Sequence, residues 1–119
     1  MQRGEIRFVD LGPVRGSEAD KRRPAVIVSN DGANATAARL GRGVPTTVPV
    51  TVPVTSNTSR LYPFPVLLPA AVTGLKRDSK ARAEQVRSVS IDYLGARIGE
   101  LGAVLVADLD EALRLHLAL

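Results

Sequence analysis

The residues of this chain best suited to chemistry are the cations immediately before a short apolar segment. Residues 21–23 read Lys-Arg-Arg and precede Pro24, and the four residues at 25–28 are all apolar. Such a run predicts a buried strand, and Pro24 belongs at its first position because proline has no N–H to donate to a ladder. Arg23 is therefore expected at the rigid mouth of a strand, where its planar guanidinium could bind two phosphate oxygens at once.

The composition excludes several other kinds of site. The chain has 119 residues, no cysteine and one histidine, which excludes thiol catalysis, disulfides and zinc sites built from cysteine and histidine. A metal ion would have to be bound by carboxylates alone, so no metal or cofactor is expected. A chain of this length is expected to form one domain over residues 1–119, burying roughly two thirds of its unfolded surface.

Charge and hydropathy indicate where the protein acts. Sixteen Lys and Arg against twelve Asp and Glu give a formal charge of +4, which alone suits solubility as well as nucleic-acid binding. The basic residues gather at 15–23, 39–42, Arg60 and 76–87, and this clustering favours nucleic acid. No signal-peptide pattern opens the chain and no apolar run approaches the ~18 residues that span a bilayer, so a soluble, cytoplasmic protein is expected.

Short apolar segments alternate with polar stretches along the chain, which predicts strands joined by loops. The expected strands cover residues 5–11, 25–29, 64–68 and 83–88. The expected loops and turns cover residues 14–22, 31–43 and 74–80, the second with a helical turn at most.

Residues 44–55 contain a repeat in which Pro45, Pro49 and Pro53 recur every four residues. In a strand, N–H groups two or four residues apart point the same way, so the three missing donors lie along one side. That side must be an edge or a bend of the sheet. The alternative for residues 44–48 is a low-complexity extended loop.

The C-terminal part predicts an amphipathic helix. Leu105, Leu109, Leu113 and Leu117 are four residues apart, and such a stripe is typical of packing against a core. His116, the only histidine, lies beside the stripe and is expected to be structural rather than catalytic. With about five short strands, the predicted class is mainly β with short helices (β+α), in the form of a small barrel.

Seven short segments, in this order, resemble the MazF/PemK family of toxin ribonucleases. They are RGEI at 3–6, DLGP at 10–13, GSE at 16–18, RPAVIVSN at 23–30, VPVTSN at 52–57, YPFPVLL at 62–68 and EQVRS at 84–88. One such segment would be weak evidence for the family, but seven in order over nearly the whole chain are strong evidence. Relative to the family pattern, one four-residue unit is added within residues 44–55.

The resemblance implies a fold, an activity and partners. The fold would be an SH3-like barrel of five or six strands with a C-terminal amphipathic helix. The activity would be sequence-specific, metal-independent cleavage of single-stranded RNA by the toxin of a type II toxin-antitoxin system, which inhibits translation and growth. The implied partners are the RNA substrate, a labile MazE-like antitoxin and a second copy of the chain in a homodimer.

Cleavage of RNA without metal needs a base for the 2′-hydroxyl, a donor for the leaving 5′-oxygen and cationic stabilisation of the phosphorane. By the resemblance, Arg23 and Thr55 fill two of these places. A guanidinium stays protonated at any working pH, so Arg23 is assigned charge stabilisation and not the base role. Thr55 would donate its hydroxyl hydrogen, although alone it would be an ordinary strand residue. Glu18, in the GSE segment, is the candidate base.

The remaining candidates would hold or read RNA. Arg and Lys bind phosphates, Asn and Gln can read the edges of unstacked bases, and Tyr62 is the best candidate for a stacked base or else a core residue. These candidates are Ser17, Lys21, Arg22, Asn30, Ser56, Asn57, Arg60, Tyr62, Glu84, Gln85 and Arg87.

Two other functions stay open from the sequence. A non-catalytic toxin of the same fold could inhibit DNA gyrase, but such a protein would not need the Arg23 and Thr55 pair. A plain nucleic-acid-binding module would bind RNA in a salt-dependent manner without cleaving it.

Overall fold

The computed structural model describes residues 1–10, 22–40, 49–59 and 66–119. The strands are β1 (Glu5–Asp10), β2 (Arg22–Ile27), β3 (Val50–Thr55), β4 (Val66–Leu68), β5 (Ser79–Ala81), β6 (Arg87–Ser88) and β7 (Leu94–Glu100). The helices are α1 (Asp31–Leu40), α2 (Ala70–Thr73) and α3 (Ala103–Leu117), with 3-10 turns η1 (Ala83–Gln85) and η2 (Ile91–Tyr93).

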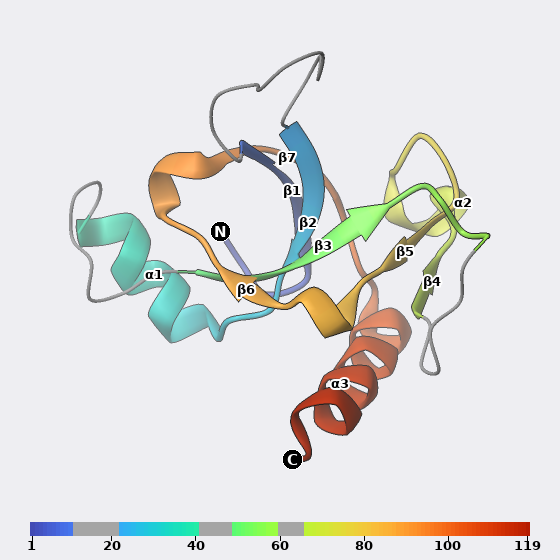
Figure 1. The fold of residues 1–119 in the computed structure, drawn as a ribbon. Helices are drawn as coiled ribbons and strands as arrows, with labels where there is room; N and C mark the ends of the chain where they lie inside the picture. Colours follow the sequence, from blue (N-terminus) through green and yellow to red (C-terminus); the bar gives the residue numbers. More distant parts are fainter. Residues whose placement is uncertain (11–21, 41–48, 60–65) are drawn as a thin grey trace, which may run out of the picture.

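The seven described strands form one antiparallel sheet in the order β4-β5-β3-β2-β1-β7, with β6 also paired to β3 (Figure 1). The predicted class, mainly β with a C-terminal helix, is confirmed. The sheet is open, however, because the described strands at its two ends, β4 and β7, do not pair with each other. None of the helices in the described ranges is long and apolar enough to cross a bilayer.

The two ends of the sheet approach each other by packing. Gly74 ends α2 in the left-handed conformation, with φ 85°, which glycine adopts without strain. Gly99 of β7 lies so close that an added Cβ would be 2.1 Å from the Thr73 carbonyl oxygen. The end of α2 therefore rests directly on β7, which gives the sheet a barrel-like form without a closing ladder.

The core lies between one face of the sheet and α3. Ile6, Val26 and Val52 form a row across β1, β2 and β3 and are fully buried. Leu109 is buried against them from α3, which lies below the sheet in Figure 1. The predicted amphipathic helix is thus confirmed, although its last leucine, Leu117, is 49% exposed.

The prediction of a loop at residues 31–43 was wrong for its first ten residues, because Asp31–Leu40 form α1. Asn30 caps this helix, since its Oδ1 accepts a hydrogen bond from the Ala33 N–H at 2.8 Å. Only Asn34 and Ala37 of α1 are buried. The sequence of α1 therefore has no apolar stripe by which the helix could have been predicted. The helix is held by its cap and by the buried Asn34 amide, which donates a hydrogen bond to the Ser29 carbonyl at 2.9 Å.

The expected start of the second strand was also wrong. β2 begins at Arg22, three residues earlier than expected, so Pro24 lies inside the strand. Proline is tolerated there because β2 pairs with β1 from Arg22 onward but with β3 only from Ala25 onward. The Val28 N–H donates to the Val50 carbonyl of β3, so the missing N–H of Pro24, four residues earlier, points beyond the paired part of β3.

The region after β4 differs most from the prediction. Residues 83–88 were expected to be one strand, but they form η1 and the two-residue β6, and β5 begins within the expected turn at 74–80. β7, α2 and η2 were not predicted. Pro53 lies at an interruption, because β3 pairs with β6 at its start and with β5 at its end. This interruption is the bend that the proline repeat required; Pro45 lies outside the described residues.

Candidate active site

The start of β2 and the end of β3 meet because the two strands are antiparallel. Their register runs from Ile27 opposite Thr51 to Ala25 opposite Pro53. Arg23 lies two residues before Ala25 on β2, and Thr55 lies two residues after Pro53 on β3, so both lie just beyond the last paired residues, at the same end of the two strands. Side chains two apart share a face of a sheet and cross-strand neighbours are in contact range. The structure therefore brings the predicted catalytic pair, 32 positions apart in the sequence, to one edge of the sheet.

A pocket of about 890 Å³ opens at this edge. Its wall is formed by β1, β2, β3, the turn between α2 and β5, and the segment from η1 to β6. Its basic lining residues are Arg22, Arg23, Lys76, Arg77, Arg82 and Arg87. None of the described lining residues is acidic. Glu84, whose Oε1 lies 3.6 Å from Arg82 Nε, is outside this lining. Six cations around one hollow whose described lining has no carboxylate produce a positive potential, which attracts and holds a polyanion.

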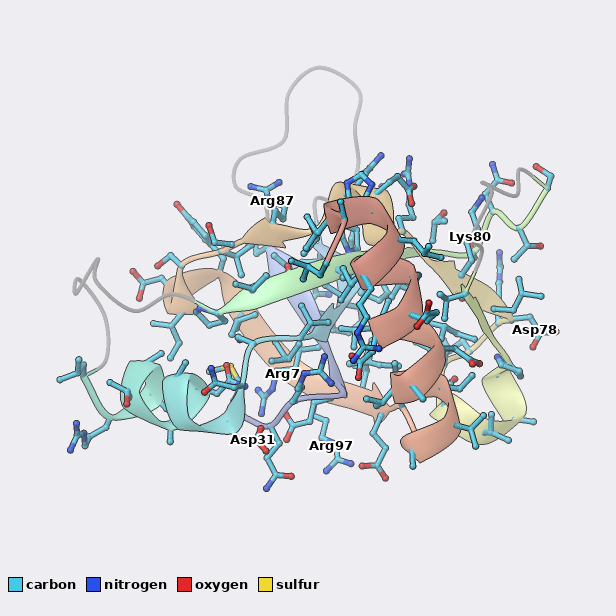
Figure 2. All side chains as sticks on the ribbon, turned by 90° about the horizontal axis from the view of Figure 1, so that it is seen from below. Arg7, Asp31, Asp78, Lys80, Arg87 and Arg97 are labelled. Carbon is cyan, nitrogen blue, oxygen red and sulfur yellow. The ribbon has the colours of Figure 1, made fainter. Side chains whose placement is uncertain are left out.

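Several arginines outside the pocket are paired with carboxylates. Arg7 Nε lies 2.9 Å from Glu5 Oε2, and Arg97 Nη2 lies 2.7 Å from Glu100 Oε2. In Figure 2 Arg97 lies at the lower edge of the molecule and Arg87 at the upper edge. In the pocket, by contrast, the side chains of three cations have no carboxylate partner within the part of the chain that the structure describes. These are Lys76, Arg77 and Arg87.

The two arginines at the start of β2 are held differently. Arg22 lies over the ring of Phe8 on β1, with its Cζ 5.2 Å from the ring centroid. Arg23 donates a hydrogen bond from Nη1 to the Arg22 carbonyl at 3.1 Å. Arg23 is exposed. Its guanidinium is thus tied to the strand end and faces the pocket.

Thr55 keeps a hydroxyl hydrogen available for a substrate. Its Oγ1 accepts a hydrogen bond from the Asn57 N–H at 3.1 Å, so the oxygen is fixed while its hydrogen is not used in that bond. Thr51, four residues earlier on β3, is 1% exposed, and its hydroxyl donates a hydrogen bond to the Arg87 carbonyl at 3.3 Å. Both line the pocket, but only Thr55 has both a partly exposed side chain and an uncommitted donor.

The structure sorts the other candidates into three groups. Those that line the pocket are Arg22, Ser56, Gln85 and Arg87, together with Arg23 and Thr55. Those outside the lining are Asn30, which caps α1, Asn57, whose Oδ1 accepts from Ser59, and Glu84, whose Oε1 lies 3.6 Å from Arg82 Nε. Those outside the described residues are Ser17, Glu18, Lys21, Arg60 and Tyr62.

Sequence reasoning missed three cations of the pocket. Lys76, Arg77 and Arg82 lie in the basic stretch at 76–87, but their positions could not be assigned without the course of β5 and η1. Lys80 is a further surprise, since it is buried at 5% exposure and pairs with Thr55 in the ladder between β3 and β5. His116 is exposed on α3 and does not line the pocket.

No group of three or more His, Cys, Asp or Glu that could hold a metal ion occurs among the described residues.

Similar proteins were found at the level of sequence and of structure. Residues 2–117 match the family described as PemK-like, MazF-like toxin of type II toxin-antitoxin system. The chain is 60% identical to Endoribonuclease MazF9 of Mycobacterium tuberculosis, covering 100% of this chain and 98% of that protein. It is 33% identical to Endoribonuclease EndoA of Bacillus subtilis, covering 100% and 96% of the two chains.

Two solved structures share the fold. The crystal structure of MazF from Deinococcus radiodurans matches with a TM-score of 0.74 and 25% identity, covering 100% of this chain and 97% of that one. A crystal structure of MazE-MazF from the same organism matches with a TM-score of 0.75 and 24% identity, again covering 100% and 97%.

Proposed function

Because this chain belongs to the family of PemK-like, MazF-like toxins of type II toxin-antitoxin systems, we propose that its endoribonuclease reaction takes place in the cationic pocket at the end of β3. The observation that carries this proposal is that Arg23 and Thr55 lie at the same end of the neighbouring strands β2 and β3 and both line a pocket with six cations. The substrate is single-stranded RNA, including messenger RNA.

The reaction uses the substrate's own 2′-hydroxyl. The 2′-oxygen attacks the neighbouring phosphorus, the bond from phosphorus to the 5′-oxygen breaks, and a 2′,3′-cyclic phosphate and a 5′-hydroxyl result. The 2′-proton passes to a base and the leaving 5′-oxygen gains a proton. Arg23 stabilises the negative charge that develops on the phosphorane oxygens, and Thr55 donates its hydroxyl hydrogen to the same group. Glu18 is the proposed base.

Polar residues of the same pocket recognise the bases of the substrate. Ser56 and Gln85 line it and offer hydroxyl and amide groups that can bind base edges, and Arg22 and Arg87 bind the backbone. An amide can both donate and accept hydrogen bonds, which suits a choice among bases. Cleavage is therefore sequence-specific, with Gln85 as a reading residue.

The proposed partner is a MazE-like antitoxin that occludes the pocket. An acidic, extended segment laid over the basic residues at 15–23 and the adjoining pocket cations would compete with RNA for the same charges. An anisotropy assay with labelled RNA tests this, because bound antitoxin should abolish RNA binding, and unchanged RNA affinity would contradict direct occlusion. The same proposal includes that this chain forms a homodimer and acts in the cytoplasm.

The two alternative functions are less well supported. Relatives at 60% and 33% identity over the whole chain are endoribonucleases by name. A gyrase inhibitor or a simple binding module would also have no use for a threonine hydroxyl and an arginine in the lining of one pocket.

The decisive experiment is incubation of the purified chain with a long RNA in excess EDTA, followed by mapping of every new 5′ end. We expect cuts that share one short sequence motif, and far fewer cuts in the same time with the Arg23→Lys variant. Binding without any cut would contradict the nuclease proposal and favour a binding module, whereas cuts at unrelated sequences would contradict specific reading.

A further inference from the structure

The turn between α2 and β5, residues 74–78, carries two cations that the mechanism above does not use. Lys76 and Arg77 both line the pocket and both are exposed. Neither side chain has a hydrogen bond or an ion pair within the part of the chain that the structure describes. Two adjacent, unneutralised cations at a pocket wall cost electrostatic repulsion in the free protein, which an anionic ligand would relieve.

The backbone of this turn is held in place. The Gly74 N–H donates to the Ala70 carbonyl at 3.2 Å, and the Leu75 N–H donates to Thr73 Oγ1 at 3.3 Å. Asp78 Oδ1 accepts from the Ala70 N–H at 2.9 Å. On the other side, Ser79 Oγ donates to the Arg77 carbonyl at 2.9 Å. The two cations therefore extend from a preorganised turn, which lowers the entropic cost of binding a ligand there.

The register of the sheet places this turn across β3 from Arg23. β5 pairs with β3 at Val54 and Thr55, so the turn that precedes β5 lies just beyond the end of β3. Arg23 lies on the other side of β3, on β2. Strands on the two sides of a shared neighbour are about 10 Å apart, a distance that one phosphate does not span and consecutive phosphates do. In Figure 2, Arg87 and Asp78, the residue that follows Arg77, lie on either side of α3.

We propose that Lys76 and Arg77 form a second phosphate subsite, which binds the RNA phosphate next to the one that is cleaved. The inference rests on the proposed function, because it takes the phosphate at Arg23 and Thr55 as the scissile one. The volume of the pocket, about 890 Å³, is near the upper end for sites that hold a whole ligand, so more than one nucleotide fits. The subsite contributes equally to ground-state and transition-state binding, and it acts on KM rather than on kcat.

The experiment compares Arg77→Gln with Arg39→Gln. Both arginines are exposed, but Arg39 lies in the last turn of α1 and does not line the pocket. With a short RNA that carries the mapped motif, Arg77→Gln should raise KM about tenfold and leave kcat unchanged, as for a lost charge-assisted hydrogen bond. It should also reduce the slope of log K against log salt by about 0.7, the value for one phosphate of a single strand. Arg39→Gln should change neither quantity.

A second set of RNAs tests which phosphate is bound. Each carries one uncharged methylphosphonate, either at the phosphate 5′ or at the one 3′ of the cut. The RNA whose methylphosphonate is at the bound position should have a lower affinity for the unsubstituted protein than the fully charged RNA. With that RNA, Arg77→Gln should cause no further loss of affinity. Lys76→Gln should behave like Arg77→Gln, and melting curves should show that all variants are folded.

Two results would overturn the inference. One is an equal effect of Arg77→Gln on charged and uncharged RNAs at both flanking positions; the other is an Arg77→Gln variant indistinguishable from Arg39→Gln. In both cases normal cleavage by the unsubstituted protein would leave the proposed function standing. If the unsubstituted protein cut no RNA at all, the proposed function would fail and the subsite assignment with it.

Discussion

Replacing Arg23 with lysine keeps the positive charge at the start of β2 but removes the planar arrangement of N–H donors that a guanidinium provides. The guanidinium of Arg23 donates from Nη1 to the Arg22 carbonyl at 3.1 Å, and its planar fork presents further N–H groups. A lysine ammonium is a single point of charge at the end of a flexible chain. It can approach a phosphate, but it cannot stay tied to the strand and present two parallel donors at the same time.

The size of the effect follows from this geometry. Loss of one preorganised donor to a developing oxyanion lowers kcat about 10²- to 10³-fold. Because the charge is retained, we expect the lower end, about 100-fold, which corresponds to about 2.7 kcal/mol in the activation free energy. RNA binding should hardly change. Since Arg23 is exposed, the free energy of unfolding should change by less than about 0.5 kcal/mol.

Arg22→Lys is the matched control, one residue away. Arg22 lies over the Phe8 ring at 5.2 Å, an exposed cation-π contact worth about 0.5–1 kcal/mol, part of which lysine retains. The loss of kcat in Arg22→Lys should therefore stay below about fivefold. The assay is steady-state cleavage of a short fluorogenic RNA, which separates kcat from KM, together with binding of an analogue that has a 2′-deoxy sugar at the cut.

Two results would refute the reasoning. If Arg22→Lys and Arg23→Lys lost equal amounts of kcat, the position at the strand mouth would carry no special geometry. If Arg23→Lys raised KM and left kcat unchanged, Arg23 would be one more phosphate anchor, and another residue would have to stabilise the phosphorane.

Three further predictions concern the threonines, metal dependence and the closing of the sheet. Thr55→Ala should lower kcat about 10²-fold. Thr51→Ala should leave kcat nearly unchanged and cost about 1 kcal/mol of stability by removing its hydrogen bond to the Arg87 carbonyl. The reverse order in a cleavage assay would show that Thr51, and not Thr55, is the catalytic threonine. Cleavage should persist in excess EDTA, and a strict requirement for Mg²⁺ would contradict the assigned mechanism. Gly99→Ala should lower the free energy of unfolding by about 1–3 kcal/mol in urea titration, because its Cβ would lie 2.1 Å from the Thr73 carbonyl oxygen; an unchanged midpoint would mean that α2 can move away at no cost.

Local patterns in the sequence were sufficient for several elements and for the two residues of the proposed centre. The leucine spacing predicted α3, and the apolar run after Pro24 predicted β2 apart from its ends. Arg23 and Thr55 were named from short segments that resemble a family. In each case the signal is contained in a few neighbouring residues, because a period of 3.6, a buried run and a strand end are all properties of one element.

Other features depended on contacts between distant segments. The helix α1 has no apolar stripe, so only its Asn30 cap and the buried Asn34 amide distinguish it from a loop. Asn30 caps that helix, and the contact with RNA predicted for it stays a prediction. Glu84 lies beside Arg82, outside the pocket lining, and the contact with RNA predicted for it likewise stays a prediction.

What the sequence by itself determined is the kind of chemistry: cations and hydroxyls in a chain with one histidine, at strand ends that suit a phosphate. Only the tertiary structure decided where these groups meet. The register of β2 on β3 brings the strand ends that carry Arg23 and Thr55 into one pocket, and the pairing of β5 with β3 brings Lys76 and Arg77 to the same pocket. Register follows from burial of one face of the whole sheet, because a shift by one residue would turn the core side chains outward. That choice is made by all the strands together and cannot be read from any one of them.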